Sequence, residues 1–351
     1  MLRNRWLPVL LSALLPALAS AQQGSVDVIQ VHGKFLEGNL AGDSPDRSVS
    51  VYLPPSYAKE PNRRYPVIYM LHGFGDSDDK WFGRTKHWMN LPPVLDNALK
   101  SGSKEMILVM PNAFTRFQNS GYSISAVTGD WEQFIAKELV AFVDGRYRTL
   151  PSAASRGLAG HSMGGYGTLR IGMKYPRVFS SLYALSPCCL EPMMDPQTLQ
   201  KRVALAETIH EAADIDKAGF IAKTVLASGA AWSPNPKHPP FFMDLPWQDG
   251  QFQPVVAAKW AANAVLAMVD QHLAELRQLK AIALDVGDQD ALAAPVRMLD
   301  ELLTRNNIAH TMEVYSGNHL NHVGDRIQTK MMPFFSQNLI FADPGERTPR
   351  K

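Results

Sequence analysis

The sequence lacks several features that mark whole classes of proteins. Its 351 residues include only two cysteines, and 35 Lys and Arg nearly balance 33 Asp and Glu, giving a formal charge of +2. Two cysteines cannot hold a chain of this length as a disulfide scaffold, and a near-neutral charge provides no basic surface for nucleic acid. Because 46% of the residues are hydrophobic, the chain is too apolar to stay disordered. A large buried core is therefore expected.

Long hydrophobic runs are also scarce. The longest, Trp6–Leu18, follows two arginines and precedes Ala19-Ser20-Ala21. This order of basic, apolar and small residues is typical of a secretory signal peptide, and the 13-residue run is shorter than the roughly 20 residues that a membrane span needs. We expect residues 1–21 to be removed, leaving residues 22–351 with no net charge. The mature protein should be secreted, to the periplasm or the exterior, without a membrane anchor.

Short apolar runs alternate with helical patterns over most of the mature chain. The runs predict strands at 49–53, 65–71, 106–110, 156–160, 180–185, 281–286 and 311–315. Several are continuously apolar, as in VIYML and ILVM, which is typical of strands buried on both faces of a parallel sheet. Helical patterns separate them, and one begins with the capping pair Asp130 and Gln133. The order predicts an α/β architecture of three layers, with helices covering a mainly parallel sheet.

One stretch interrupts this alternation. Roughly 90 residues separate the strands predicted at 180–185 and 281–286, far more than an ordinary crossover connection requires. Helical patterns near 205–213 and 255–279 flank a segment rich in proline and aromatic residues, where proline excludes regular structure. Two interpretations are open. In the first, the stretch is a long surface loop that its aromatic side chains hold to the core. In the second, it is a cap-like insertion, about residues 190–260, that forms one wall of a substrate cleft.

A glycine-rich turn has the pattern of a nucleophile. Gly160-His161-Ser162-Met163-Gly164 fits G-x-S-x-G and lies between a predicted strand and a helical pattern, the context that gives this motif its meaning. The small residues allow the strand to turn sharply and leave the Ser162 hydroxyl exposed. A free hydroxyl is a weak nucleophile and needs a neighbouring base. The alternative, a turn with a passive serine, is less consistent with that context.

A second glycine-rich turn, Leu71-His72-Gly73-Phe74-Gly75, follows the apolar run YPVIYML. In hydrolases with a nucleophile elbow, N–H groups from such a turn and from the residue after the nucleophile stabilise the oxyanion. We expect the N–H groups of Met163 and Phe74 to form this oxyanion hole, with Gly75 as the neighbouring alternative. A plain strand-to-loop turn is the other interpretation.

An acid and a base should follow the nucleophile in the order Ser, Asp, His. Asp285, Asp288 and Asp290 lie at the end of one predicted strand, where the functional groups of open α/β sheets gather. Asp285 is still in the strand register, and of the two loop carboxylates Asp290 is preferred over Asp288. Two histidines follow the last strand. His319 lies immediately beyond it in a glycine-containing loop and is preferred as the base over His322.

These motifs together resemble the esterase D or putative esterase family of α/β-hydrolases. The resemblance covers about residues 46–339 and rests on GHSMGG, LHGFG, TGDWEQF, GDQD and GNH. It implies an α/β-hydrolase fold, with Ser162 as nucleophile, Asp290 as orienting acid and His319 as general base. The family includes feruloyl and acetyl xylan esterases, S-formylglutathione hydrolase, siderophore esterases and mycolyltransferases. The signal peptide is more similar to the secreted, carbohydrate-active members.

The sequence therefore predicts a secreted serine esterase that needs no metal or organic cofactor. Feruloyl or acetyl esters of carbohydrates are the expected substrates, and the candidate substrate contacts are His72, Trp131, Trp232, Phe241 and Trp247. An acyltransferase to a sugar hydroxyl would use the same three groups. A non-catalytic binding protein on a hydrolase scaffold is an alternative of another class.

Two further clusters have open interpretations. Adjacent cysteines, Cys188 and Cys189, could form a vicinal disulfide in an oxidising compartment, and a pair of reduced, buried thiols is the alternative. Asp76, Asp78 and Asp79 could suggest a cation site, but a solvated loop that caps a short helix is favoured.

Overall fold

The computed structural model describes residues 23–192 and 195–342. Its central feature is an eight-stranded sheet in the order β1-β2-β4-β3-β7-β8-β11-β12. The pairs β1–β2 and β2–β4 are antiparallel, and every pair from β4 to β12 is parallel. The strands are β1 (Ser25–His32), β2 (Asp46–Leu53), β3 (Val67–Leu71), β4 (Ile107–Pro111), β7 (Arg156–His161), β8 (Ser181–Leu185), β11 (Ala281–Gly287) and β12 (Thr311–Tyr315).

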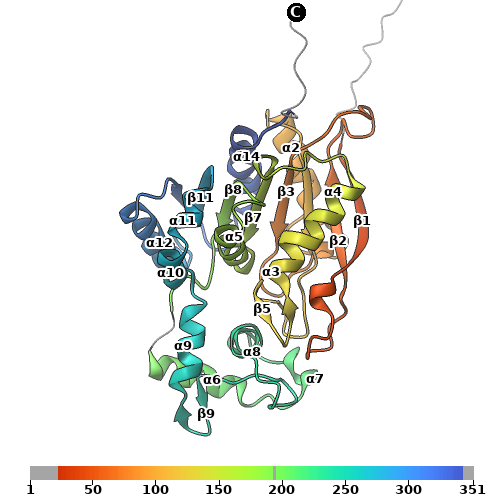
Figure 1. Ribbon diagram of the computed structural model, residues 1–351. Helices are drawn as coiled ribbons and strands as arrows, with labels where there is room; N and C mark the ends of the chain where they lie inside the picture. Colours follow the sequence, from red (N-terminus) through yellow and green to blue (C-terminus); the bar gives the residue numbers. More distant parts are fainter. Residues whose placement is uncertain (1–22, 193–194, 343–351) are drawn as a thin grey trace, which may run out of the picture.

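Helices cover both faces of this sheet (Figure 1). In β3, Val67 and Tyr69 pack into one apolar cluster and Ile68 and Met70 into the other, which explains the continuously apolar run. One face carries α3 (Trp131–Gln133), η2 (Phe134–Leu139), α4 (Val140–Arg146), α5 (Met163–Lys174) and α12 (Ala293–Arg305). The other carries α1 (Asp78–Trp81), α2 (Leu91–Lys100), α13 (Val323–Arg326), η5 (Ile327–Met331) and α14 (Met332–Asn338). Short turns of helix lie at η1 (Lys34–Leu36) and η3 (Ala153–Ser155).

Most of the long stretch between β8 and β11 forms a separate group of helices beyond one end of the sheet (Figure 1). It has its own apolar cluster, which includes Val203, Leu226 and Met243. The hairpin of β5 (Ile124–Ser125) and β6 (Gly129–Asp130) reaches toward it. The elements of the separate group are α6 (Pro196–Ala206), α7 (Ala212–Ile215), α8 (Phe220–Trp232), β9 (Trp247–Gln248), β10 (Gln251–Phe252) and α9 (Pro254–Ala262). The rest of the stretch, α10 (Val265–Met268), η4 (Val269–Gln271) and α11 (Leu273–Leu276), packs into the main core beside the sheet.

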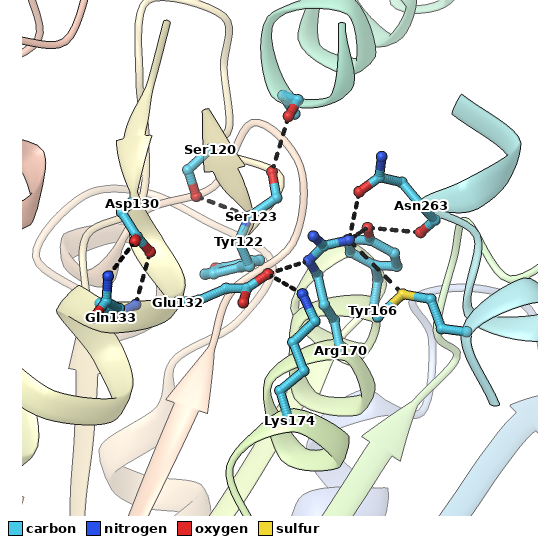
Figure 2. A network of polar contacts seen from close by, with 12 residues as sticks. Ser120, Tyr122, Ser123, Asp130, Glu132, Gln133, Tyr166, Arg170, Lys174 and Asn263 are labelled. Carbon is cyan, nitrogen blue, oxygen red and sulfur yellow. Dashed lines mark hydrogen bonds and ion pairs between the residues drawn. The ribbon is translucent and has the colours of Figure 1, made fainter. Parts of the chain in front are cut away.

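A buried polar network joins the end of this insertion to the body of the molecule (Figure 2). Arg170 of α5 donates to Glu132 at 2.6 Å and to the Asn263 side chain at 2.7 Å. Lys174 donates to the same oxygen of Glu132 at 2.8 Å, and the Tyr166 hydroxyl donates to the Asn263 carbonyl at 2.9 Å. Because α5 begins directly after Ser162, the network fixes the insertion relative to the glycine-rich elbow.

The predicted three-layer α/β architecture is confirmed. All seven predicted strands are present, and β1 was not predicted because its exposed and buried residues are mixed in an edge strand. Within the insertion the helix boundaries were wrong. The pattern near 205–213 covers the end of α6 and a loop, the pattern at 255–279 is divided among α9, α10, η4 and α11, and α8 was missed. Among the described residues, no helix has the length and apolar character to cross a bilayer.

Candidate active site

The glycine-rich elbow lies between β7 and α5 and holds Ser162 at φ 58° and ψ −115°. An L-residue rarely adopts positive φ, so the surrounding contacts must hold this conformation. A Cβ on Gly160 would lie 2.2 Å from the carbonyl oxygen of Gly164, and a Cβ on Gly164 would lie 1.9 Å from that of Leu71. Only glycine fits at either position, and the close approach leaves the serine on a tight turn.

His319 lies within hydrogen-bonding distance of both Ser162 and Asp290. Nε2 of His319 lies 2.9 Å from Oγ of Ser162, and Nδ1 of His319 lies 2.7 Å from Oδ2 of Asp290. The three residues follow β7, β12 and β11, which are parallel to their neighbours and therefore end at the same edge of the sheet. This is the geometry in which a histidine can remove a proton from a serine hydroxyl while a carboxylate orients the ring.

Asp290 is held as a carboxylate. Burial alone would raise its pKa, but hydrogen bonds from His319 and from the N–H of Leu292 outweigh that effect and lower the pKa below its ordinary value. Its side chain is 3% exposed, against 33% for His319. A buried anion beside one ring nitrogen stabilises the charge that the ring acquires when its other nitrogen takes a proton.

The other candidates for acid and base have different partners. Asp285 lies inside β11 and accepts from Arg326 at 2.9 Å and from the hydroxyl of Tyr183 at 2.8 Å. Asp288 accepts from the N–H of Gly317 at 3.0 Å and so joins the two loops. His322 faces Asp325 on the surface, at 3.2 Å. The structure therefore brings Asp290 and His319 to Ser162, whereas Asp285, Asp288 and His322 have other partners.

The residues predicted to form the oxyanion hole differ in the partners of their N–H groups. Met163 is the first residue of α5, so its N–H has no carbonyl one turn earlier to bond. The N–H of Gly75 donates to the carbonyl of Gln118 at 3.1 Å, which removes Gly75 as a donor to substrate. Phe74 lines the same cavity as Ser162 and Met163. The arrangement therefore favours Phe74 over Gly75 as the second donor.

A cavity of about 700 Å³ opens at Ser162. His319 and Asp290 line one side, and residues of α6 and α8 line the other. The insertion thus forms a wall of the cleft, in agreement with the second of the two interpretations of this stretch. Trp232, one of the predicted substrate contacts, belongs to that wall.

The other predicted substrate contacts do not line this cavity. Phe241 and Trp247 line a second cavity, of about 590 Å³, within the insertion. His72 is fully buried and accepts from the N–H of Ala113 at 2.9 Å. Trp131 is 1% exposed and donates from Nε1 to the carbonyl of Thr128 at 2.8 Å. The side chains of His72 and Trp131 pack in the core and are therefore not available to contact a substrate.

The two clusters with open interpretations are the cysteine pair and the acidic loop. Cys188 and Cys189 are free thiols with sulfurs 2.7 Å apart, and both line the main cavity. The hydrogen bond with Cys189, followed by burial, raises the pKa of Cys188 well above its usual value. In the acidic loop, Asp76 accepts from Trp81 and faces His87. Within residues 23–192 and 195–342, no group of three or more His, Cys, Asp or Glu could hold a metal ion.

His161 occupies the first variable position of the G-x-S-x-G motif, and the motif does not indicate a role for it. The ring is 2% exposed, and its Nε2 lies 2.9 Å from the backbone oxygen of His319. The ring centroids of the two histidines are 4.7 Å apart. Burial, followed by the nearby His319, lowers the pKa of His161 to about 4. A neutral His161 therefore supports the loop that carries His319, a contact that no sequence signal indicates.

The comparison with protein families agrees with this geometry. A family model described as putative esterase matches residues 44–340. The chain belongs to the putative esterase family.

An endo-1,4-beta-xylanase/feruloyl esterase of Xylanibacter ruminicola is 27% identical over 216 residues, 57% of this chain and 29% of that protein. Esterase Rv1288 of Mycobacterium tuberculosis is 32% identical over 135 residues, 38% of this chain and 27% of the relative. The chain thus spans less than a third of the length of these relatives.

Solved structures of other proteins have the same fold. A ferulic acid esterase superimposes with a TM-score of 0.63 at 20% identity, covering 91% of this chain and 100% of that one. An S-formylglutathione hydrolase from Agrobacterium tumefaciens gives a TM-score of 0.56 at 13% identity, over 91% and 97% of the two chains. The predicted α/β-hydrolase fold is therefore confirmed.

Proposed function

We propose that this protein is a serine esterase that hydrolyses carboxylic esters. The observation that carries the proposal is the chain of contacts from Ser162 through His319 to Asp290, three residues that line one cavity. Membership in the putative esterase family supports it.

The reaction follows from the positions of these groups. His319 Nε2 removes the proton of Ser162 as Oγ attacks the ester carbonyl, and Asp290 stabilises the resulting imidazolium. The N–H groups of Met163 and Phe74 donate to the oxygen that becomes negative. His319 then gives its proton to the departing alcohol and leaves an acyl-enzyme. Water, activated by the same nitrogen, attacks this intermediate and releases the acid and free Ser162.

The proposal extends to location and substrate class. The basic and apolar residues before Gln22 support secretion to the periplasm or the exterior. Relatives that include a xylanase/feruloyl esterase support esters attached to carbohydrates, with feruloyl and acetyl groups as the first to test.

Replacing the nucleophile tests the mechanism. Ser162→Ala should lower turnover of 4-nitrophenyl acetate by at least about 1,000-fold, because only binding and oxyanion stabilisation remain, and should abolish labelling by a fluorophosphonate. Turnover or labelling at the wild-type level would exclude the proposal, and a non-catalytic protein would show neither with the wild type.

Two carboxylates of the same loop provide a matched comparison. Asp290→Asn should lower kcat strongly, because an amide cannot stabilise the imidazolium as an anion does. Asp288→Asn should keep most of the activity, since its side-chain oxygen can still accept from Gly317. Equal losses in the two variants would contradict the assignment of Asp290.

A further inference from the structure

The cavity beside Ser162 is much larger than the acyl groups of the simplest substrates. Its volume of about 700 Å³ falls within the range of about 300–1,000 Å³ for pockets that hold drug-sized ligands. A water molecule occupies about 30 Å³ of liquid, so an acetyl group of three heavy atoms would fill only a small part. Leu199, Val203 and Val225 contribute apolar lining from α6 and α8. The cavity therefore suits a long, largely apolar group.

The position of His319 indicates which half of the ester occupies the space beneath the insertion. The departing oxygen must lie near Nε2 of His319, which protonates it. Asn318 and Leu320, on either side of His319, are exposed and line the cavity, so the alcohol can leave toward solvent there. The acyl group stays bound to Ser162 after the alcohol has left, and the lining from α6 and α8 remains available to it.

One charged side chain in that wall lacks a partner. Arg202 lines the cavity from α6, on the same face as Leu199 and Val203. Its Nε is buried and has no hydrogen-bond partner. No carboxylate of the described residues forms an ion pair with Arg202, although exposed Glu191 lines the same cavity. A guanidinium is always charged and binds carboxylates in a planar, two-pronged geometry. An unpaired buried donor is costly, so a ligand that supplies an acceptor here gains affinity.

We propose that Arg202 binds a carboxylate at the far end of the acyl group, so that the preferred substrates are half-esters of long dicarboxylic acids. This proposal rests on the proposed function, because it describes the acyl side of the same reaction. The hydroxyl of Ser228, which lines the same wall from α8, is a further donor to such a group. Arg202 is a specificity residue and takes no part in proton transfer.

Paired substrates test this proposal. We compare 4-nitrophenyl esters of simple alkanoic acids with half-esters of dicarboxylic acids of the same chain length, from four to ten carbons. Wild type should favour the half-ester at the longer lengths by roughly 10- to 100-fold in kcat/KM, the effect expected of a hydrogen-bonded charge pair. Arg202→Met should lose this preference, so that kcat/KM for the long half-esters falls to the value for the neutral esters of the same length, because Met keeps much of the apolar bulk but cannot bind a carboxylate.

Two variants and one binding measurement complete the test. Lys201→Met removes the adjacent, exposed cation of α6 and should leave the preference unchanged, and Arg202→Lys should retain part of it. In the Ser162→Ala background, calorimetry should show tighter binding of the long half-ester than of its neutral counterpart, and Arg202→Met should remove the difference.

The outcomes separate this proposal from the proposed function. If the wild type hydrolyses neutral esters through Ser162 but favours no half-ester at any length, or if Arg202→Met weakens both series equally, the role of Arg202 is wrong and the esterase remains. If no ester is hydrolysed, including 4-nitrophenyl acetate, both proposals fail.

Discussion

At the scale of single residues, the most informative side chain is His161. Its ring lies against His319 and against Trp88, at centroid distances of 4.7 and 5.7 Å, and its Nδ1 is buried without a partner. A proton on this ring would place a second positive charge beside the histidine that must itself become charged during the reaction. Burial keeps His161 neutral, and a neutral ring with its proton on Nε2 donates to the backbone of the base loop.

This lowered pKa predicts a specific dependence of stability on pH. The pKa falls from 6.5 to about 4 on folding, so the unfolded chain binds more protons between these values. The stabilising contribution is complete above pH 6.5 and is lost as the pH falls toward 4. Urea unfolding at pH 7 and 4.5 should show that the wild type loses about 2–3 kcal/mol more than His161→Gln.

An exposed histidine is the control for this measurement. His210 lies on the surface, so His210→Gln should lose stability with acid as steeply as the wild type. If His161→Gln also follows the wild-type slope, the ring is not held neutral by the fold.

At the scale of elements, the insertion depends on polar contacts as much as on its own apolar cluster. Glu132 of α3 is 1% exposed and bonds both Arg170 and Lys174 of α5, while Asn263, at the end of α9, bonds Arg170 (Figure 2). The sequence predicted the cap of α3, because Asp130 and Gln133 are three residues apart and indeed pair at 2.9 Å. It could not predict the network, whose members are up to 131 positions apart in the chain.

Removing the centre of this network should destabilise the protein strongly. Arg170→Met leaves Glu132 buried with Lys174 as its remaining cation and leaves the Asn263 side chain without its donor. Urea denaturation should show a loss of about 3 kcal/mol in the free energy of unfolding. This value is near the lower end of the range of losses caused by breaking a buried ion pair.

The exposed pair Lys217–Asp214, with side chains 79% and 51% accessible, is the matched comparison. Lys217→Met should change stability by less than about 0.5 kcal/mol. Comparable losses in the two variants would show that the buried network does not hold the insertion in place.

At the scale of the whole molecule, the sheet and the insertion each supply one side of the cleft. The sheet brings Ser162, Asp290 and His319 to one edge because β7, β11 and β12 are parallel. The insertion adds α6 and α8, which close a volume of about 700 Å³ over that edge. The sheet thus positions the three side chains, and the size and lining of the cavity depend on the insertion.

The first 21 residues lie outside the described part of the chain, and their removal remains a prediction. A full-length chain expressed in a bacterium should yield a secreted protein whose N-terminal sequence begins at Gln22. Ala21→Tyr should block this cleavage, because the site requires a small residue, whereas Ser20→Leu, at the variable position, should be tolerated. A secreted protein that retains Met1, or cleavage that is insensitive to Ala21→Tyr, would contradict the assignment.

The sequence by itself determined seven of the eight strands of the main sheet and the glycine-rich elbow, and it singled out Ser162, Asp290 and His319. Continuous apolar runs and glycines at fixed spacing are local requirements, so they are visible without a structure: Gly160 and Gly164 are needed because any Cβ would collide with backbone. Only the tertiary structure paired the N–H of Gly75 with Gln118, placed His72 and Trp131 in the core, and brought His161 against His319. It also placed Arg202, 40 positions beyond Ser162, in the wall of the same cavity. These outcomes depend on contacts between segments far apart in the chain, and such contacts form only when the sheet and the insertion pack together.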